Sequence, residues 1–78
     1  MDLQPQIRKV IAEVAGKPVE ADVDESLFES GFLDSFALAM LVNGLEKEFG
    51  IKIPDSDLIP QRFDSISRIE RYLAGRLK

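Results

Sequence analysis

Apolar residues recur every three or four positions through the middle of the chain, from residue 35 to residue 49. These positions are Leu38, Leu41, Val42, Leu45 and Phe49. The spacing predicts a helix with one buried stripe. Gly50 follows the stripe and is a typical helix stop. At the other end, Asp34 or Ser35 suits the N-cap, because either side-chain oxygen can accept a hydrogen bond from a first-turn N–H.

Two further stretches carry the same periodicity, one near each end of the chain. In residues 3–15 the apolar positions are Leu3, Ile7, Val10, Ile11 and Val14. In residues 65–77 they are Ile66, Ile69, Leu73 and Leu77. Both patterns predict amphipathic helices. Gly16 and Pro18 are placed to end the first helix, and Ser65 is placed to cap the last one.

The connections between these helices differ in length. Residues 16–34 form a long loop, and because compact domains rarely leave such a loop unpacked we expect apolar side chains to pin it. The candidate pins are Val19, Val23, Leu27, Phe28 and Leu33. In the second connection, a short extended stretch at 51–54 precedes at most a short helix at about 55–60, limited by Pro60. The sequence therefore predicts a single all-α domain over residues 1–78: a small four-helix bundle with three main helices, one short third helix and a long first loop.

The composition removes several kinds of chemistry. The 78 residues include no cysteine and no histidine, which excludes disulfides, thiol nucleophiles, the usual zinc sites and the commonest general base. Asp22, Asp24 and Ser26 alternate as in a calcium loop, but Leu27 and Leu33 stand where that loop needs glycine and glutamate. We therefore expect no metal site and no catalytic residues, and we predict that the chain is not an enzyme in its own right.

Charge is distributed unevenly along the chain. The net charge is −4, with 12 acidic and 5 basic residues in positions 1–60 and 2 acidic and 5 basic residues in positions 61–78. Six acids and no base lie between Glu20 and Asp34. This balance disfavours nucleic acid and favours basic protein partners, although a merely solvated loop explains the same charges equally well. The chain lacks an apolar run of ~20 residues and a signal-peptide pattern, so we expect cytoplasmic residence and no direct membrane insertion.

Three segments together resemble the acyl carrier protein family across nearly the whole chain. They are Leu33-Asp34-Ser35-Phe36, the helix and exit from Leu41 to Pro54, and Phe63-Asp64-Ser65-Ile66. In that family a phosphopantetheinyl transferase moves 4′-phosphopantetheine from coenzyme A onto the serine of an Asp-Ser-Leu-type motif. The resemblance implies that Ser35 carries this arm, whose thiol holds an acyl or aminoacyl thioester, and that Asp34 takes part in recognition by the transferase. It also implies a loading ligase and a downstream transferase or synthase as partners.

The sequence departs from the fatty-acid carriers beside the predicted attachment site. Phe36 replaces the usual aliphatic residue. In this respect the chain resembles D-alanyl carriers and other stand-alone aminoacyl carriers. Ala37 and Met40 stand where fatty-acid carriers usually place acids. We therefore expect a largely apolar partner-binding face of Phe36, Ala37 and Met40, with Lys47 farther along the helix. Fatty-acyl, polyketide, nonribosomal-peptide and D-alanyl cargoes all remain open, although a dedicated carrier is favoured over the housekeeping fatty-acid role.

Two alternatives accompany this interpretation. The chain could be an unmodified helical adaptor that binds a protein directly through the face of Phe36, Ala37 and Met40. In that case Ser35 would be a simple helix cap. Alternatively, a rotated helix would place Phe36 and Met40 in the core, so the exposure of these two side chains distinguishes the arrangements.

Overall fold

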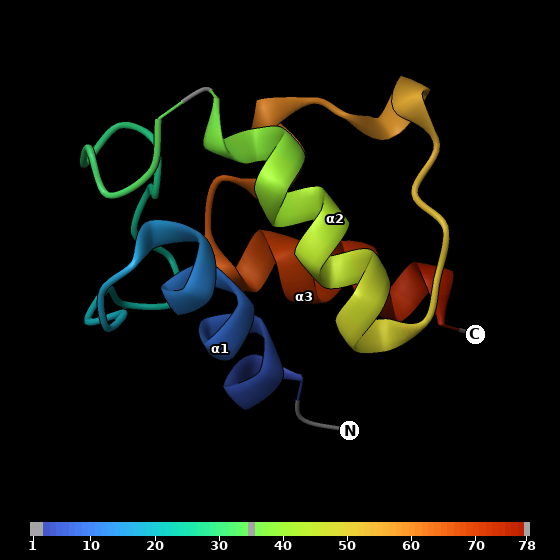
Figure 1. Ribbon diagram of the computed structural model, residues 1–78, viewed down its shortest axis with the longest axis horizontal. Coiled ribbons are helices and arrows are strands. Elements are labelled where there is room, and N and C mark those ends of the chain that lie inside the picture. The colour runs from blue at the N-terminus through green and yellow to red at the C-terminus, as the bar shows by residue number, and fades with distance from the viewer. Residues whose placement is uncertain (1–2, 35, 78) are drawn as a thin grey trace.

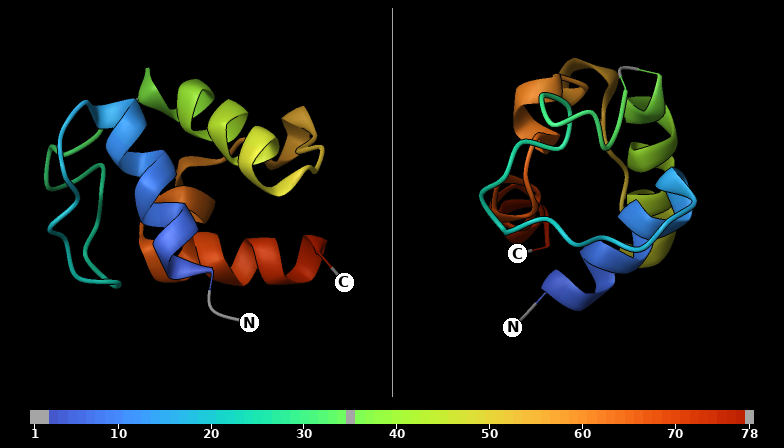
Figure 2. Two further views of the ribbon diagram at one scale, coloured as in Figure 1. Left: turned by 60° about the horizontal axis from the view of Figure 1, so that its bottom comes forward. Right: turned by 90° about the vertical axis from the view of Figure 1, so that its left-hand side faces the viewer.

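The computed structural model describes residues 3–34 and 36–77, so the predicted attachment residue Ser35 lies outside the described residues. In these described residues the fold has three α-helices: α1 (Gln4–Ala15), α2 (Ala37–Phe49) and α3 (Ile66–Arg76). Helix α1 packs against both α2 and α3, and the long first loop lies at the opposite end of the molecule from the C-terminus of α3 (Figures 1 and 2). No strand occurs in the described part of the chain, and the all-α prediction is confirmed.

The connection from α2 to α3 contains no fourth α-helix. Instead of one short helix at about 55–60, the structure has two 3-10 turns, η1 (Asp55–Asp57) and η2 (Pro60–Phe63). Ile59 between them is extended, with φ −111° and ψ 122°, because the residue before a proline is disfavoured in the helical region. The expected four-helix bundle is therefore, in the described residues, a packing of three α-helices closed by a connection with two 3-10 turns.

The predicted stripes of the three helices form a single core. The fully buried large side chains are Ile7, Ile11, Leu27, Leu41, Leu45, Phe63, Ile66, Ile69 and Leu73. Burial of each such side chain stabilises the fold by about 1.5–3 kcal/mol. Leu27 belongs to the first loop, so the loop is part of the core rather than an appendage. None of the helices in residues 3–34 and 36–77 has the length and apolar character that a bilayer span requires.

The first loop is pinned as predicted. Leu27 and Leu33 are buried, and Val19, Val23 and Phe28 pack partly buried against the core. The backbone adds a second anchor, because the Ser67 N–H donates a hydrogen bond to the Val23 carbonyl oxygen at 2.9 Å. The loop is thereby tied to the first turn of α3.

The helix ends follow the signals in the sequence. Gly16 and Gly50 adopt left-handed backbone conformations, with φ 73° and 64°, and end α1 and α2. Ser65 caps α3, since its hydroxyl accepts a hydrogen bond from the Arg68 N–H at 3.2 Å. These three predicted boundaries are confirmed.

Candidate functional site at the start of α2

Asp34 organises the entry into α2. Its carboxylate Oδ1 accepts a hydrogen bond from the Ala37 N–H at 2.9 Å, and its carbonyl oxygen lies 3.0 Å from the same nitrogen. Asp34 is one of the two residues predicted to cap this helix, and its side chain binds the N–H of the first residue of α2. The helix begins at Ala37, two residues later than position 35. Asp34 is also exposed, so its carboxylate lies on the surface beside the predicted attachment residue.

Two large apolar side chains at the start of α2 are exposed to solvent. Phe36 is 85% exposed and Met40 is 55% exposed, whereas Ala37 is half-buried. The rotated helix that would bury Phe36 and Met40 is therefore wrong. Lys47 is exposed as well, and it lies three helical turns from Phe36 on the same face because the spacing is 11 residues. The residues predicted to bind partners thus include an exposed apolar pair with a cation farther along α2.

Beside this exposed face, α2 packs closely against α1. Gly44 faces Val10, and a Cβ added to Gly44 would lie only 2.7 Å from Val10 Cγ1. Leu41 and Leu45 are fully buried on the same side. This contact sets the rotation of α2 and so determines that Phe36 and Met40 face outward.

Asp64, just before α3, binds the first loop through hydrogen bonds. Its Oδ1 accepts hydrogen bonds from the Ser26 hydroxyl at 2.7 Å and from the Phe28 N–H at 3.2 Å, and its carbonyl oxygen accepts one from the Leu27 N–H. The sequence analysis gave Asp64 no such role. The residues next to Asp64 in the sequence give no indication that it contacts Ser26, which lies 38 residues earlier.

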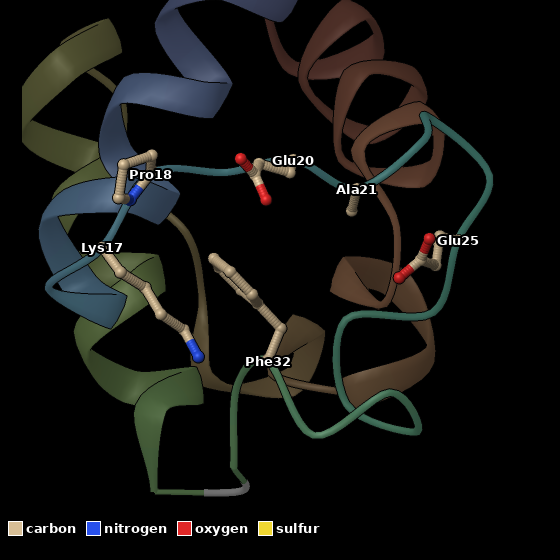
Figure 3. Close-up of a pocket in the computed structure, with 6 residues that line it drawn as sticks. All are labelled: Lys17, Pro18, Glu20, Ala21, Glu25 and Phe32. Carbon is tan, nitrogen blue, oxygen red and sulfur yellow. The ribbon is translucent and has the colours of Figure 1, made fainter.

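A surface hollow of about 420 Å³ opens between the two limbs of the first loop. Figure 3 shows the Phe32 ring rising into it, with Lys17, Pro18, Glu20, Ala21 and Glu25 around it. The Lys17 ammonium lies 4.7 Å from the centre of the Phe32 ring, which is a cation–π distance. The periodicity of the sequence did not predict this hollow, since it is formed by loop residues.

The comparison with known proteins identifies the family. The phosphopantetheine attachment site family matches residues 5–73. The chain belongs to this family of phosphopantetheine-binding carriers. The resemblance stated from the sequence is thus confirmed, and the prosthetic group is a covalently attached phosphopantetheine.

Several curated relatives cover most of the chain. It is 30% identical over 69 residues to a D-alanyl carrier protein of Leuconostoc mesenteroides, covering 88% of each chain. A D-alanyl carrier protein of Streptococcus mutans is 32% identical over 69 residues, covering 88% of this chain and 87% of its own. Another, from Lactobacillus delbrueckii subsp. bulgaricus, is 35% identical over 57 residues, covering 73% and 71%.

The described residues fit a bulky group at the start of α2. Both neighbours of position 35, Asp34 and Phe36, are exposed, and an arm that partner enzymes must reach requires such a surface position. Once bound, phosphopantetheine supplies a thiol, which the cysteine-free chain itself lacks. The chain's own contribution is to hold Asp34 and Phe36 at the surface, through the hydrogen bond of Asp34 to Ala37, the contacts of Asp64 with the first loop and the packing of α2.

Proposed function

We propose that the chain is a D-alanyl carrier protein in which Ser35 bears the 4′-phosphopantetheine arm and the arm's thiol carries D-alanine as a thioester. The family match over residues 5–73, which spans the Asp34-Ser35-Phe36 motif at the start of α2, carries this proposal. The D-alanyl carrier relatives favour D-alanine over fatty-acyl, polyketide or nonribosomal-peptide cargo. The identity of Ser35 as the attachment residue follows from the motif.

Each residue around the arm has a distinct part in this proposal. Asp34 presents a surface carboxylate next to Ser35 for recognition by the phosphopantetheinyl transferase. Phe36 and Met40 form the apolar contact for the loading ligase and for the downstream transferase, with Ala37 between them and Lys47 at the edge. Exposed apolar side chains of this size are typical of interaction surfaces rather than of solvated helix faces.

The carrier performs no catalysis in this proposal. The ligase forms the thioester at the expense of ATP, the carrier presents it, and the downstream enzyme removes the alanyl group. The exposed Phe36 and Met40 are also compatible with an unmodified adaptor, but the family's covalent prosthetic group favours the carrier.

The cargo is tested by loading the holo chain. The chain carrying phosphopantetheine is incubated with ATP, a D-alanine-activating ligase and either D-alanine or L-alanine, and its intact mass is recorded. We expect a gain of one alanyl group with D-alanine, removed by hydroxylamine as a thioester requires, and a much smaller gain with L-alanine. A holo chain that stays unloaded with D-alanine but accepts a fatty-acyl group would overturn the cargo assignment.

A further inference from the structure

Two anchors flank the proposed attachment position in the sequence. Before it, the Leu33 N–H donates a hydrogen bond to the Leu27 carbonyl oxygen at 2.9 Å, and both leucine side chains are buried. After it, the Ala37 N–H in the first turn of α2 donates to the Asp34 carboxylate at 2.9 Å. Residues 34–36 alone separate Leu33 from Ala37. The described chain is therefore anchored shortly before and shortly after position 35.

The first of these anchors depends on Asp64. Its carbonyl oxygen accepts the Leu27 N–H. Its carboxylate Oδ1 accepts the Ser26 hydroxyl at 2.7 Å and the Phe28 N–H at 3.2 Å. Leu27, in the middle of this triplet, is also the residue whose carbonyl oxygen accepts the Leu33 N–H. The contacts of Asp64 thus extend in one further hydrogen bond to Leu33, the residue before Asp34 in the sequence.

Asp64 is itself held in place by the core. Its neighbours Phe63 and Ser65 are only 0% and 4% exposed, and Ser65 caps α3. Within residues 3–34 and 36–77, no cation forms an ion pair with Asp64, and its carboxylate accepts hydrogen bonds from the first loop. The first loop passes the start of α3 (Figure 2). The loop therefore takes its position from a buried and capped part of the fold.

We propose that Asp64 is a positioning residue for the modification of Ser35, acting through the first loop rather than by contact with the arm. This inference rests on the proposed function, because it takes Ser35 as the residue that receives the arm. In that reaction the serine oxygen forms the new bond to phosphorus, adenosine 3′,5′-bisphosphate leaves coenzyme A, and the serine proton is released. A loop without the Asp64 contacts would lose more conformational entropy when the transferase docks, and binding would be weaker.

A positioning role predicts a specific kinetic change. When only a fraction of the molecules holds the competent arrangement, the apparent affinity for a partner falls by that fraction. Once the transferase has docked, the arrangement is complete and the chemical step proceeds as before. We therefore expect loss of the Asp64 carboxylate to raise the KM of the transferase for the apo chain several-fold, with kcat unchanged. If the competent arrangement persists in about one molecule in five, the rise is about fivefold.

The test measures initial rates of phosphopantetheinylation by intact mass, with coenzyme A in excess and the concentration of apo chain varied. Asp64→Ala removes both hydrogen bonds of the side chain and should raise KM. Asp64→Asn keeps an oxygen acceptor and loses the charge, so it should retain most of the wild-type KM. A transferase that bound the Asp64 charge directly would respond to both variants alike, and that result would contradict a positioning role.

Ser26→Ala tests the same contact from the loop. It removes the hydroxyl that donates to Asp64 Oδ1 and should raise KM in the same direction. Adding Ser26→Ala to Asp64→Ala should raise KM little further, because the two substitutions break the same hydrogen bond. A double variant whose rise in KM is the full product of the two single rises would show that the residues act independently, against the inference.

Two control variants separate positioning from charge and from stability. Asp24→Ala removes an exposed carboxylate of the same loop, whose side chain forms no ion pair in the described part of the chain. Ile69→Val removes one methylene group from a fully buried side chain of α3 and lowers stability without touching the hydrogen bonds of the loop. Both should keep the wild-type KM. Urea denaturation verifies that every variant is folded under the assay conditions.

Several outcomes would overturn the inference. An unchanged KM for folded Asp64→Ala would show that the contact does not position the site, while Ser35 stays the attachment residue. An equal rise in Asp24→Ala would assign the effect to charge, and an equal rise in Ile69→Val would assign it to stability. A fall in kcat at constant KM would place Asp64 in a step after docking. If the folded wild type gains no phosphopantetheinyl group, the proposed function fails as well.

Discussion

The Asp64 carboxylate accepts a hydrogen bond from the Ser26 hydroxyl at 2.7 Å across 38 residues of sequence. The same oxygen accepts the Phe28 N–H, so one carboxylate at the entry to α3 holds a turn of the first loop. Leu33, farther along this loop, donates its N–H to the Leu27 carbonyl oxygen at 2.9 Å. The contact thereby connects α3 to the stretch that leads directly to Asp34.

Removing this carboxylate should loosen the loop. We expect Asp64→Ala to lower the free energy of unfolding by about 1–3 kcal/mol, because hydrogen bonds to charged groups are worth about that much and two donors lose their acceptor. Urea denaturation measures the loss, and hydrogen exchange at Phe28 and Leu33 localises it. Asp55→Ala, at an exposed carboxylate of η1, should change stability by no more than about 0.5 kcal/mol. Equal stabilities of the two variants would refute the role of Asp64.

Two glycines in helices should respond to alanine in opposite directions. Gly44→Ala places a Cβ 2.7 Å from Val10 Cγ1, and overpacking of this kind costs about 1–3 kcal/mol. In α3, Gly75 has no atom within 4 Å of an added Cβ. Gly75→Ala should therefore stabilise the protein by about 0.5 kcal/mol through helix propensity. Thermal unfolding of both variants checks this, and a Gly44→Ala variant as stable as the wild type would contradict the close α1–α2 contact.

The apolar face of α2 should matter for loading but not for folding. We expect Phe36→Asp and Met40→Glu to leave stability within about 0.5 kcal/mol, since both side chains are largely exposed. If the ligase buries them, losing about 1.5–3 kcal/mol of contact should raise its KM for the holo carrier at least about tenfold. Holo protein is verified by mass before the assay. Ile59→Asp provides the control, because Ile59 is also an exposed apolar residue but lies between η1 and η2. An unchanged KM for Phe36→Asp and Met40→Glu would exclude this face as the docking surface.

Tyr72 should make the free energy of unfolding depend on pH in the alkaline range. Burial raises the pKa of the Tyr72 phenol, and the hydrogen bond to Asp57 together with its charge raises it further. Because the pKa is higher in the folded than in the unfolded state, this contribution is complete below the unfolded value of about 10 and is lost as the pH rises through the folded value. Urea titrations between about pH 9 and 11 should show a steeper decline for the wild type than for Tyr72→Phe. Parallel declines would contradict this.

The sequence predicted the three α-helices well because each has its own signals. The stripe of α3 and its Ser65 cap, for instance, lie within a dozen residues of one another. The described part of α2 begins at Ala37, and Asp34, one of the two predicted caps, accepts a hydrogen bond from the Ala37 N–H three residues later, as N-cap side chains do; position 35 lies outside the described residues. The short third helix was wrong in form because Pro60 and the extended Ile59 divide it into two turns.

Only those parts of the candidate site whose residues are close together in the sequence could be predicted. The Asp34-Ser35-Phe36 motif and the outward position of Phe36 follow from the neighbouring sequence. The Asp64 contact and the hollow around Phe32 depend on segments that meet only in the folded chain. Pattern analysis cannot pair Ser26 with Asp64, since neither position has a periodic or capping signal that refers to the other.

The central claim is that Ser35 carries the phosphopantetheine arm. Its most direct test is the intact mass of the chain after incubation with coenzyme A and a promiscuous phosphopantetheinyl transferase, in parallel for the wild type, Ser35→Ala and the control Ser56→Ala at an exposed serine of η1. We predict a gain of one phosphopantetheinyl group in the wild type and in Ser56→Ala and none in Ser35→Ala. A folded Ser35→Ala chain that still gains the group, or a folded wild type that does not, would contradict the claim.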